Sequence, residues 1–169
     1  AGTGGNSTHE AIELTVSAAE AGADYSLSVT PYYNKPTQEG LFEHFQAVAR
    51  SVNLPIILYN VPGRTGCDLS NDTVVKLSQI DNIVAIKDAT GDVARGAALI
   101  EAVPDGFAVF SGDDATALEL MRRGGQGNVS VTANIAARDM AAMCNLALTG
   151  EWEAAAEIDA RLSELNDLL

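Results

Sequence analysis

The feature that most constrains the fold is a regular alternation of apolar, strand-like runs with helix-like segments. Five runs recur along the chain, namely "DYSLSVT" (24–30), "PIILYN" (55–60), "NIVAIKD" (82–88), "GFAVFSG" (106–112) and "GNVSVTAN" (127–134). Their starts are 31, 27, 24 and 21 residues apart, which is too far for hairpins and suits βα units. The alternation therefore predicts a parallel sheet covered by helices.

Helical periodicity fills the segments between these runs. The first helix is predicted to begin near Ser7, because Ser7 and Glu10 form an S-x-x-E capping box ahead of an apolar pattern. Further helices are predicted at about 38–51, 71–79, 93–102, 114–123, 136–148 and 152–167.

Polar and glycine-containing groups at the ends of the runs favour one of two architectures. Runs this rich in β-branched residues belong to a parallel sheet buried on both faces, either a doubly wound open sheet or a (β/α)₈ barrel. The groups are "TPYYN", "YNVPGRTG", "KDATGD", "SGDD" and "SVTAN". An open sheet concentrates its ligand contacts at one switch point, whereas a barrel gathers the carboxyl ends of many strands around one axis. We therefore predict an α/β fold of the (β/α)₈ TIM-barrel type.

The length predicts that this barrel is incomplete in the chain. A full barrel typically needs about 250 residues, and the chain has 169. We expect about five to six βα units, counting the opening "AGTG" as the tail of another strand. Residues 1–150 are predicted to form the partial barrel, and residues 151–169 the start of a C-terminal helical region.

Charge and hydropathy exclude several classes of function. The net charge is −13, from 23 acidic and 10 basic residues, so binding to nucleic acid or to an anionic membrane surface is not expected. An anionic substrate would need a local cationic pocket. No apolar run reaches the ~20 residues of a membrane span, and the N-terminus lacks the pattern of a secretory signal. A cytoplasmic location is predicted by default.

Cysteines and histidines give no sign of a metal or a disulfide. Cys67 and Cys144 have neither a CxxC partner nor a histidine at ligand spacing, so we predict two reduced thiols. His9 and His44 stand alone in helical patterns and are predicted to be exposed.

Lys87 is the first candidate for chemistry. It follows the apolar residues 82–86, so it is expected at the mouth of the sheet among apolar neighbours. Desolvation disfavours the ammonium and favours a neutral, nucleophilic amine, which a Schiff-base lysine requires. The alternative is a structural lysine that extends to solvent or pairs with Asp88 or Asp92.

Two other strand ends supply groups that suit carbonyl chemistry on an acidic substrate. "LYNVPGRTG" contains Tyr59, whose phenol can give and accept a proton, and Arg64, whose planar fork suits a carboxylate. "TPYYNKPT" contains Tyr32 and Tyr33. The structural alternatives are a packed aromatic for Tyr59, a surface ion pair for Arg64, and subunit-interface contacts for the two adjacent tyrosines.

These stretches together resemble the dihydrodipicolinate synthase family of pyruvate-dependent class I aldolases. The resemblance is carried by "TPYYNKPTQEGL", "LYNVPGRTGCDL", "IVAIKDATGD" and "FSGDDATALELMRRGGQGNVSVTANIAARDM", and it extends from Ala1 to Leu169. It implies a (β/α)₈ barrel and a lyase of lysine and diaminopimelate biosynthesis. Such an enzyme condenses pyruvate with aspartate semialdehyde to give 4-hydroxy-tetrahydrodipicolinate, without a metal or an organic cofactor.

The resemblance also assigns roles to residues. It implies that Lys87 forms the Schiff base with pyruvate, that Tyr59 is the proton donor and acceptor, and that Tyr33 completes a proton relay in a neighbouring subunit. By the same comparison Arg64 binds the carboxylate of aspartate semialdehyde, while Val129 and Gly112 line the pyruvate pocket.

A regulatory site is implied for lysine-sensitive members of the family. Asn6, Glu10 and Tyr32 match positions that bind the inhibitor L-lysine at a subunit interface, although a capping-box role is a sufficient local explanation for Glu10. A homo-oligomer, either a dimer or a tetramer, is the implied assembly.

One departure from the family pattern bears on activity. The family's "GTTGE"-type segment, whose threonines contact pyruvate and the tyrosine relay, would lie upstream of Ala1, together with the first strands, and the final helices would follow Leu169. We therefore expect the isolated 169-residue chain to be inactive.

Three other functions stay open from the sequence. N-acetylneuraminate lyase and 2-keto-3-deoxy sugar-acid aldolases share the lysine and the strand tyrosine, although Arg64 and Tyr33 favour the synthase. A phosphate-binding module could use "AGTGGNST" at a helix start, but Ser7 stands where the third glycine of G-x-G-x-x-G belongs. A non-catalytic role in assembly is the third alternative.

Overall fold

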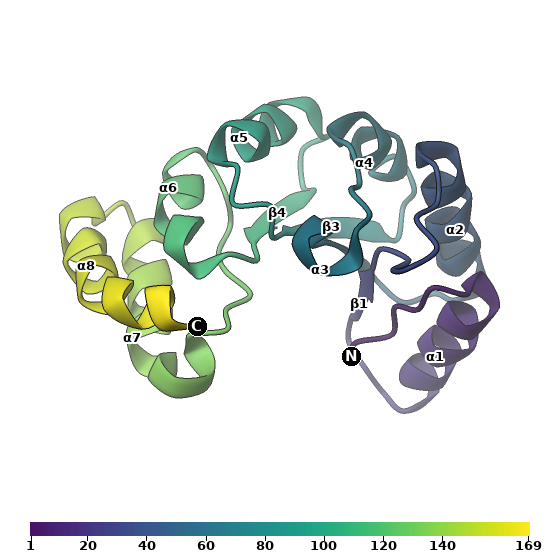
Figure 1. The fold of residues 1–169 in the computed structure, drawn as a ribbon, viewed down its shortest axis with the longest axis horizontal. Helices are drawn as coiled ribbons and strands as arrows, with labels where there is room; N and C mark the ends of the chain where they lie inside the picture. Colours follow the sequence, from purple (N-terminus) through teal and green to yellow (C-terminus); the bar gives the residue numbers. More distant parts are fainter.

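The computed structural model describes all residues from 1 to 169, and its centre is a parallel sheet of four strands. The strands are β1 (Ser26–Val29), β2 (Ile56–Asn60), β3 (Ile83–Asp88) and β4 (Ala108–Ser111). Around them lie α1 (Thr8–Glu20), α2 (Gln38–Ser51), α3 (Pro62–Thr65), α4 (Asn71–Leu77), α5 (Val93–Ala102), η1 (Asp114–Thr116), α6 (Ala117–Arg122), α7 (Ala133–Leu148) and α8 (Trp152–Leu168). Figure 1 shows an arc with the strands inside and α1, α2, α4, α5 and α6 along its outer side.

Strand order distinguishes the two architectures that the sequence left open. The order is β1-β2-β3-β4, and every pair is parallel. A doubly wound sheet reverses its strand order at a switch point, and this sheet has no reversal. The curved sheet with helices on its outer side is an incomplete (β/α)₈ barrel, so the predicted fold class is confirmed.

The two faces of the sheet have different partners. Alternate residues such as Ile56, Leu58, Ile86 and Val109 are at most 1% exposed and belong to the main hydrophobic core between sheet and helices. The residues between them in sequence lie on the inner face of the arc. One inner row contains Val29, Tyr59, Lys87 and Phe110, which are partners in the strand register. The fold therefore places Tyr59 and Lys87 side by side.

The two outermost predicted strands are reduced to single positions. Gly2 forms an isolated parallel bridge with Leu27, and Asn128 forms one with Ser111. The strand predicted over 127–134 is wrong for most of its length, because the chain bends after the bridge and α7 begins at Ala133. Asp114 causes this bend, because it accepts hydrogen bonds from the amides of Val131 and Thr132. In a longer strand these amides would not both bind one side chain.

Most helices begin and end close to the predicted residues. Ser7 caps α1 as expected, since its Oγ accepts the amide of Glu10 at 3.5 Å. Helix α7 begins three residues before the predicted start at 136, and Ala136 itself has a non-helical backbone that kinks the helix. The short helix α3 was not predicted, because four residues are too few for a periodic pattern.

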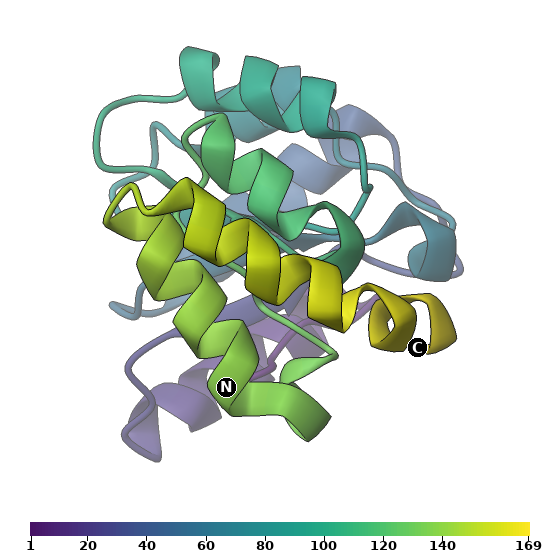
Figure 2. The ribbon, with the colours of Figure 1, turned by 90° about the vertical axis from the view of Figure 1, so that its left-hand side faces the viewer.

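A second core holds the C-terminal helices together. Its members come from α6, α7 and α8 and include Leu118, Met143 and Leu162. Figure 1 shows α7 and α8 at one end of the arc, and Figure 2 shows them packed side by side facing the viewer. The predicted domain division at residue 150 falls in the turn between these helices, and a separate C-terminal region stays a prediction. No helix combines the length and the apolar character that crossing a membrane requires.

The prediction that His44 is exposed is wrong, whereas His9 does lie in solvent. His44 is 4% exposed in α2, and its Nδ1 lies 2.9 Å from the Thr8 hydroxyl of α1. The Nε2 atom is buried without a hydrogen-bond partner. The ring also packs edge-on against Phe45. Sequence periodicity did not predict this burial, because a histidine among the apolar residues of a helix face was assigned to the solvent side.

His44 should make the stability of the chain depend on pH. Burial lowers the pKa of its ring from 6.5 to about 4, so the folded state holds the ring neutral. The unfolded chain then binds the proton at higher pH than the folded one. The stabilisation is complete above pH 6.5 and is lost as the pH falls toward 4, with a loss of up to about 2 kcal/mol between pH 7.5 and pH 5.

Urea unfolding at these two pH values measures the effect. The variant His44→Gln keeps a polar side chain but does not titrate, so its free energy of unfolding should change less with pH. His9→Gln is the matched control, because His9 is exposed beside Glu13. Equal pH dependence in the parent chain and in His44→Gln would show that another group is responsible.

Candidate active site

Lys87 and Tyr59 form a close pair on the inner face of the sheet. They are register partners on β3 and β2, and the Lys87 Nζ lies 4.0 Å from the centroid of the Tyr59 ring. Lys87 is only 8% exposed, which excludes a lysine that extends to solvent. It forms no ion pair with Asp88 or Asp92. The structural alternatives for Lys87 are therefore not found, and its amine lies against a phenol.

Gly112 sets the space available to the Lys87 side chain. A Cβ at residue 112 would lie 2.7 Å from Lys87 Cε and 2.8 Å from Ala89 Cβ. The Gly112 amide also donates to the Asp88 carbonyl at 2.8 Å, which fixes the end of β4 beside the end of β3. The glycine thus allows the lysine to lie along β4, and its role in lining the pyruvate pocket stays a prediction.

A cavity of about 400 Å³ lies beside Tyr59 on the inner face. Tyr59 and Arg64 both line it, together with Gly2, Gly4, Leu27, Val29, Tyr32, Val61 and Thr65. Arg64 lies in α3, the short helix directly after β2, and Pro62 supplies the fixed backbone angle that suits its first turn. Arg64 is exposed and forms no ion pair. A guanidinium without a protein partner at a cavity wall can bind a carboxylate.

Tyr33 does not lie in this cavity. Its side chain is 88% exposed, and its backbone has a left-handed φ of 73°. This conformation is uncommon for a residue with a bulky side chain. The neighbouring Tyr32 is 44% exposed and does line the cavity. Within one chain Tyr33 therefore lies apart from Tyr59, whereas Lys87 contacts the Tyr59 ring without itself lining the cavity.

Asn6 and Glu10 lie just before and in the first turn of α1, and Tyr32 lies in the loop after β1. The side-chain amide of Asn34 donates to the Asn6 carbonyl at 2.8 Å and joins the loop after β1 to the turn before α1. Glu10 is exposed in the first turn of α1, where its amide binds the capping Ser7. No hydrogen bond joins Asn6, Glu10 and Tyr32 to one another, and their role in lysine binding stays a prediction.

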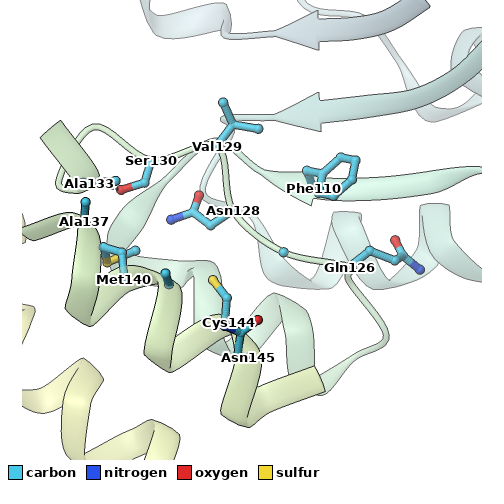
Figure 3. A pocket seen from close by; sticks show the side chains of 12 residues that line it. Phe110, Gln126, Asn128, Val129, Ser130, Ala133, Ala137, Met140, Cys144 and Asn145 are labelled. Atoms are coloured by element: carbon cyan, nitrogen blue, oxygen red, sulfur yellow. Dashed lines mark hydrogen bonds between the residues drawn. The ribbon is translucent and has the colours of Figure 1, made fainter. Parts of the chain in front are cut away.

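Val129 lies at the edge of a second cavity, of about 360 Å³. This cavity separates residues 126–130 from α7, and Figure 3 shows Met140 and Cys144 on α7 facing it. Val129 is 36% exposed, and its amide donates to the Ser111 carbonyl at 2.8 Å. Its backbone therefore continues the sheet beside β4.

Cys144 and Cys67 are both free thiols, as predicted.

Asp114 fixes the segment that carries Val129, a role that the sequence pattern did not indicate. The carboxylate accepts the side-chain amide of Asn128 at 2.7 Å and the amides of Val131 and Thr132 at 2.9 Å. Burial raises the pKa of Asp114, but these bonds, with one from Ser130, hold it below its usual value. The "GDD" motif placed an acid here, but only the fold shows that it binds residues 14 to 18 positions away.

A polar network on the outer side of the strand ends supports the α3 segment. Asn60, the last residue of β2, donates to Asp68 at 2.9 Å and accepts the amide of Leu69 at 3.0 Å. Arg95 of α5 also binds Asp68, at 2.9 Å. Burial raises the pKa of Asp68. The hydrogen bonds from Arg95 and Asn60 lower this pKa and outweigh burial, so it lies below its usual value. The network anchors the chain after Arg64 to β2 and α5.

Asp88 directly follows Lys87 but faces the helices. It is 6% exposed, and its carboxylate accepts the Thr90 amide at 3.1 Å. Burial raises the pKa of this carboxyl group, although the bonds from Thr90 and the charge of Arg95 oppose the rise. Its position on the opposite face explains why it does not pair with the lysine.

The glycines of the opening segment have a structural explanation. A Cβ at Gly4 would lie 2.3 Å from the Val29 amide nitrogen, so only a glycine permits this approach to β1. Gly2 forms the bridge to Leu27. The alternative of a phosphate-binding loop therefore gains no support. No group of three or more histidine, cysteine or acidic side chains is arranged to hold a metal ion.

Comparisons with known proteins agree on one family. The chain matches the Dihydrodipicolinate synthetase family over residues 1–169. A curated relative from Nitrosomonas europaea, 4-hydroxy-tetrahydrodipicolinate synthase, is 62% identical over 166 residues, which are 98% of this chain and 57% of the relative. The chain thus spans a little over half the length of this relative.

Solved structures give the same result. The chloride-inhibited dihydrodipicolinate synthase of Acinetobacter baumannii, complexed with pyruvate, has a TM-score of 0.97 and 59% identity, and the match covers 99% of this chain and 58% of that one. The DHDPS of Cyanidioschyzon merolae with lysine bound has a TM-score of 0.94 and 42% identity, covering 98% and 57%.

Proposed function

Since the chain belongs to the dihydrodipicolinate synthetase family, we propose that it carries the Schiff-base centre of a 4-hydroxy-tetrahydrodipicolinate synthase. The single observation that carries the proposal is the buried amine of Lys87 against the Tyr59 ring, 4.0 Å from its centroid. An amine that is buried, forms no ion pair and lies against the ring of a tyrosine suits nucleophilic attack on a carbonyl. The structural neighbour that was complexed with pyruvate supports the choice of the first substrate.

The proposed reaction begins at Lys87. Its neutral amine attacks the C2 carbonyl of pyruvate, and loss of water gives an imine. Removal of a proton from C3 converts the imine to an enamine, whose C3 attacks the aldehyde carbon of aspartate semialdehyde. We assign to Tyr59, whose ring lies against the Lys87 amine, the donation and removal of the protons in these steps. Attack of the substrate's own amine on C2 then closes the ring and releases Lys87.

Arg64 supplies the proposed contact to the second substrate. It lines the same cavity as Tyr59 and has no protein partner. Because the whole chain carries a net charge of −13, this cation is the local feature that can hold an anionic aldehyde there. Tyr33 is exposed enough to reach a neighbouring subunit, which supports the proposed relay and a homo-oligomer. The cytoplasmic location stays a prediction.

Feedback inhibition by L-lysine is the proposed regulation. The neighbour with lysine bound supports it. In this chain the inhibitor would meet Asn6, Glu10 and Tyr32, and Asn34 joins the turn before α1 to the loop that carries Tyr32.

Replacing Arg64 is expected to separate the two substrates. The test protein is a chimaera in which residues 1–169 replace the matching segment of the Nitrosomonas europaea relative, which is 62% identical. In Arg64→Ala, kcat/KM for aspartate semialdehyde should fall about ten- to a hundredfold, the scale of a lost charged hydrogen bond. Formation of the pyruvate adduct at Lys87 should stay within about twofold, because Arg64 does not contact that amine.

Matched variants sharpen this test. Arg64→Lys keeps the charge but loses the planar fork, so an intermediate loss is expected. Arg50→Ala removes an exposed arginine at the end of α2 and should change neither step. Equal losses of adduct formation and aldehyde use in Arg64→Ala would contradict the assignment, and cleavage of N-acetylneuraminate by the chimaera would favour a sister enzyme.

A further inference from the structure

Thr65 is a buried residue of the site to which no role has been given. It directly follows Arg64 in α3, is 6% exposed, and lines the cavity that Tyr59 and Arg64 share. We propose that Thr65 is a positioning residue: its hydroxyl holds the segment that carries Arg64, and with it the Thr65 carbonyl that binds the Tyr33 amide, in the arrangement that the aldehyde substrate needs. This inference rests on the proposed function and deepens it, since it names the group that sets use of the second substrate.

The Thr65 hydroxyl closes the segment that carries Arg64 into a loop. Its Oγ1 lies 3.1 Å from the Val61 carbonyl and 2.9 Å from the Cys67 carbonyl, and it accepts the Cys67 amide at 3.2 Å. One hydroxyl donates once and accepts twice, so these contacts use its single donor, which two carbonyls share, and one of its two acceptor sites. Val61 begins the segment and Cys67 ends it. Arg64 lies between them, and its own amide donates to the Val61 carbonyl at 2.9 Å.

The same residue reaches the loop that carries Tyr33. The Thr30 hydroxyl, at the end of β1, donates to Thr65 Oγ1 at 3.4 Å. The Tyr33 amide donates to the Thr65 carbonyl, also at 3.4 Å. Thr65 therefore joins the loop after β1 to the loop after β2 by one side-chain bond and one backbone bond.

Tyr33 has few other contacts that could hold it. Its side chain is 88% exposed, and its φ of 73° is a conformation that a tyrosine adopts only when its surroundings impose it. A bond from its amide to a buried residue is such a constraint. Loss of the Thr65 hydroxyl would leave the Cys67 amide without its acceptor in a buried place, so the loop would have to move to satisfy it. Both Arg64 and Tyr33 would then lose the contacts that fix their positions.

Two substitutions separate the hydroxyl from the shape of the side chain. Thr65→Val keeps the branched shape and removes the hydroxyl, whereas Thr65→Ser keeps the hydroxyl. In the 169-residue chain, amide hydrogen exchange at Cys67 and Tyr33 should become at least about tenfold faster in Thr65→Val and stay near the parent rate in Thr65→Ser. Thr73→Val is the matched control, because Thr73 is a buried, hydrogen-bonded threonine of α4 that does not line the cavity.

Kinetics of the chimaera test the consequence for the substrate. In Thr65→Val, kcat/KM for aspartate semialdehyde should fall about tenfold, with borohydride-trapped pyruvate at Lys87 unchanged, and Thr65→Ser should restore the value to within about threefold. In an Arg64→Ala background, Thr65→Val should add less than about threefold, because the two residues act as a unit. A purely structural threonine would instead give an additive loss and a smaller trapped fraction.

The outcomes distinguish this inference from the function on which it rests. No pyruvate adduct in the unsubstituted chimaera would overturn the proposed function and this inference with it. An adduct together with unchanged aldehyde kinetics in Thr65→Val would overturn the role of Thr65 alone. A loss that Thr65→Ser does not restore, or that adds fully to Arg64→Ala, would also overturn it.

Discussion

Replacement of Lys87 by arginine is expected to remove the borohydride-trapped pyruvate adduct from the peptide that spans residues 82–92. Arginine stays protonated and offers no lone pair for attack, while its length and charge resemble those of lysine. Trapping in the parent chain followed by peptide mass spectrometry measures the adduct, and the signal should fall to background. In the chimaera, condensation should fall by several orders of magnitude, as expected for loss of a covalent nucleophile.

Two further variants exclude trivial explanations for that loss. Residue 87 is 8% exposed, and methionine has a volume similar to that of lysine without its charge. Lys87→Met should therefore fold even if Lys87→Arg, with a buried guanidinium, does not. Lys76→Arg changes an exposed lysine in the last turn of α4 and should leave the adduct intact. If Lys87→Met is folded and still yields an adduct elsewhere on the chain, the Schiff-base assignment of Lys87 is wrong.

The pairing of Lys87 with Tyr59 could be expected from sequence. The hydrogen bonds that hold the loops around this pair could not. Both residues end apolar runs, and parallel strands bring such ends to one edge, so proximity followed from topology. The orientation followed from alternation, because Asp88 and Asn60 come next and face the helices. The partners of Asn60 and Asp114 were not predictable, since they lie 8 to 18 residues away in loops without periodicity.

The predictions from sequence are wrong where local pattern and tertiary contacts disagree. "GNVSVTAN" has the composition of a strand, but the Asp114 carboxylate captures the amides of Val131 and Thr132 and turns the chain. His44 interrupts an apolar helix face and yet is buried, because Thr8 of the preceding helix meets its ring. In both cases a polar side chain from a distant segment overrides propensity, as tertiary context often does.

Substitution of Gly112 by alanine tests whether the exact place of the Lys87 amine matters. The new Cβ would lie 2.7 Å from Lys87 Cε, and the lysine is flexible enough to move aside, whereas the Cβ of Ala89, at 2.8 Å, is attached directly to the backbone. The substitution should therefore displace the amine from the Tyr59 ring and also strain the ends of β3 and β4. The expected cost is about 1–3 kcal/mol in the free energy of unfolding.

The decisive measurement compares chemistry with stability in the same samples. The rate of adduct formation per folded molecule, with the folded fraction taken from urea unfolding, should fall at least about tenfold in Gly112→Ala. Gly63→Ala is the control, because a Cβ there meets nothing within 4 Å. If Gly112→Ala is less stable but its folded molecules react at the parent rate, the lysine tolerates displacement. Its burial against Tyr59 would then be incidental to attack on pyruvate, which would remove the observation on which the proposed function rests.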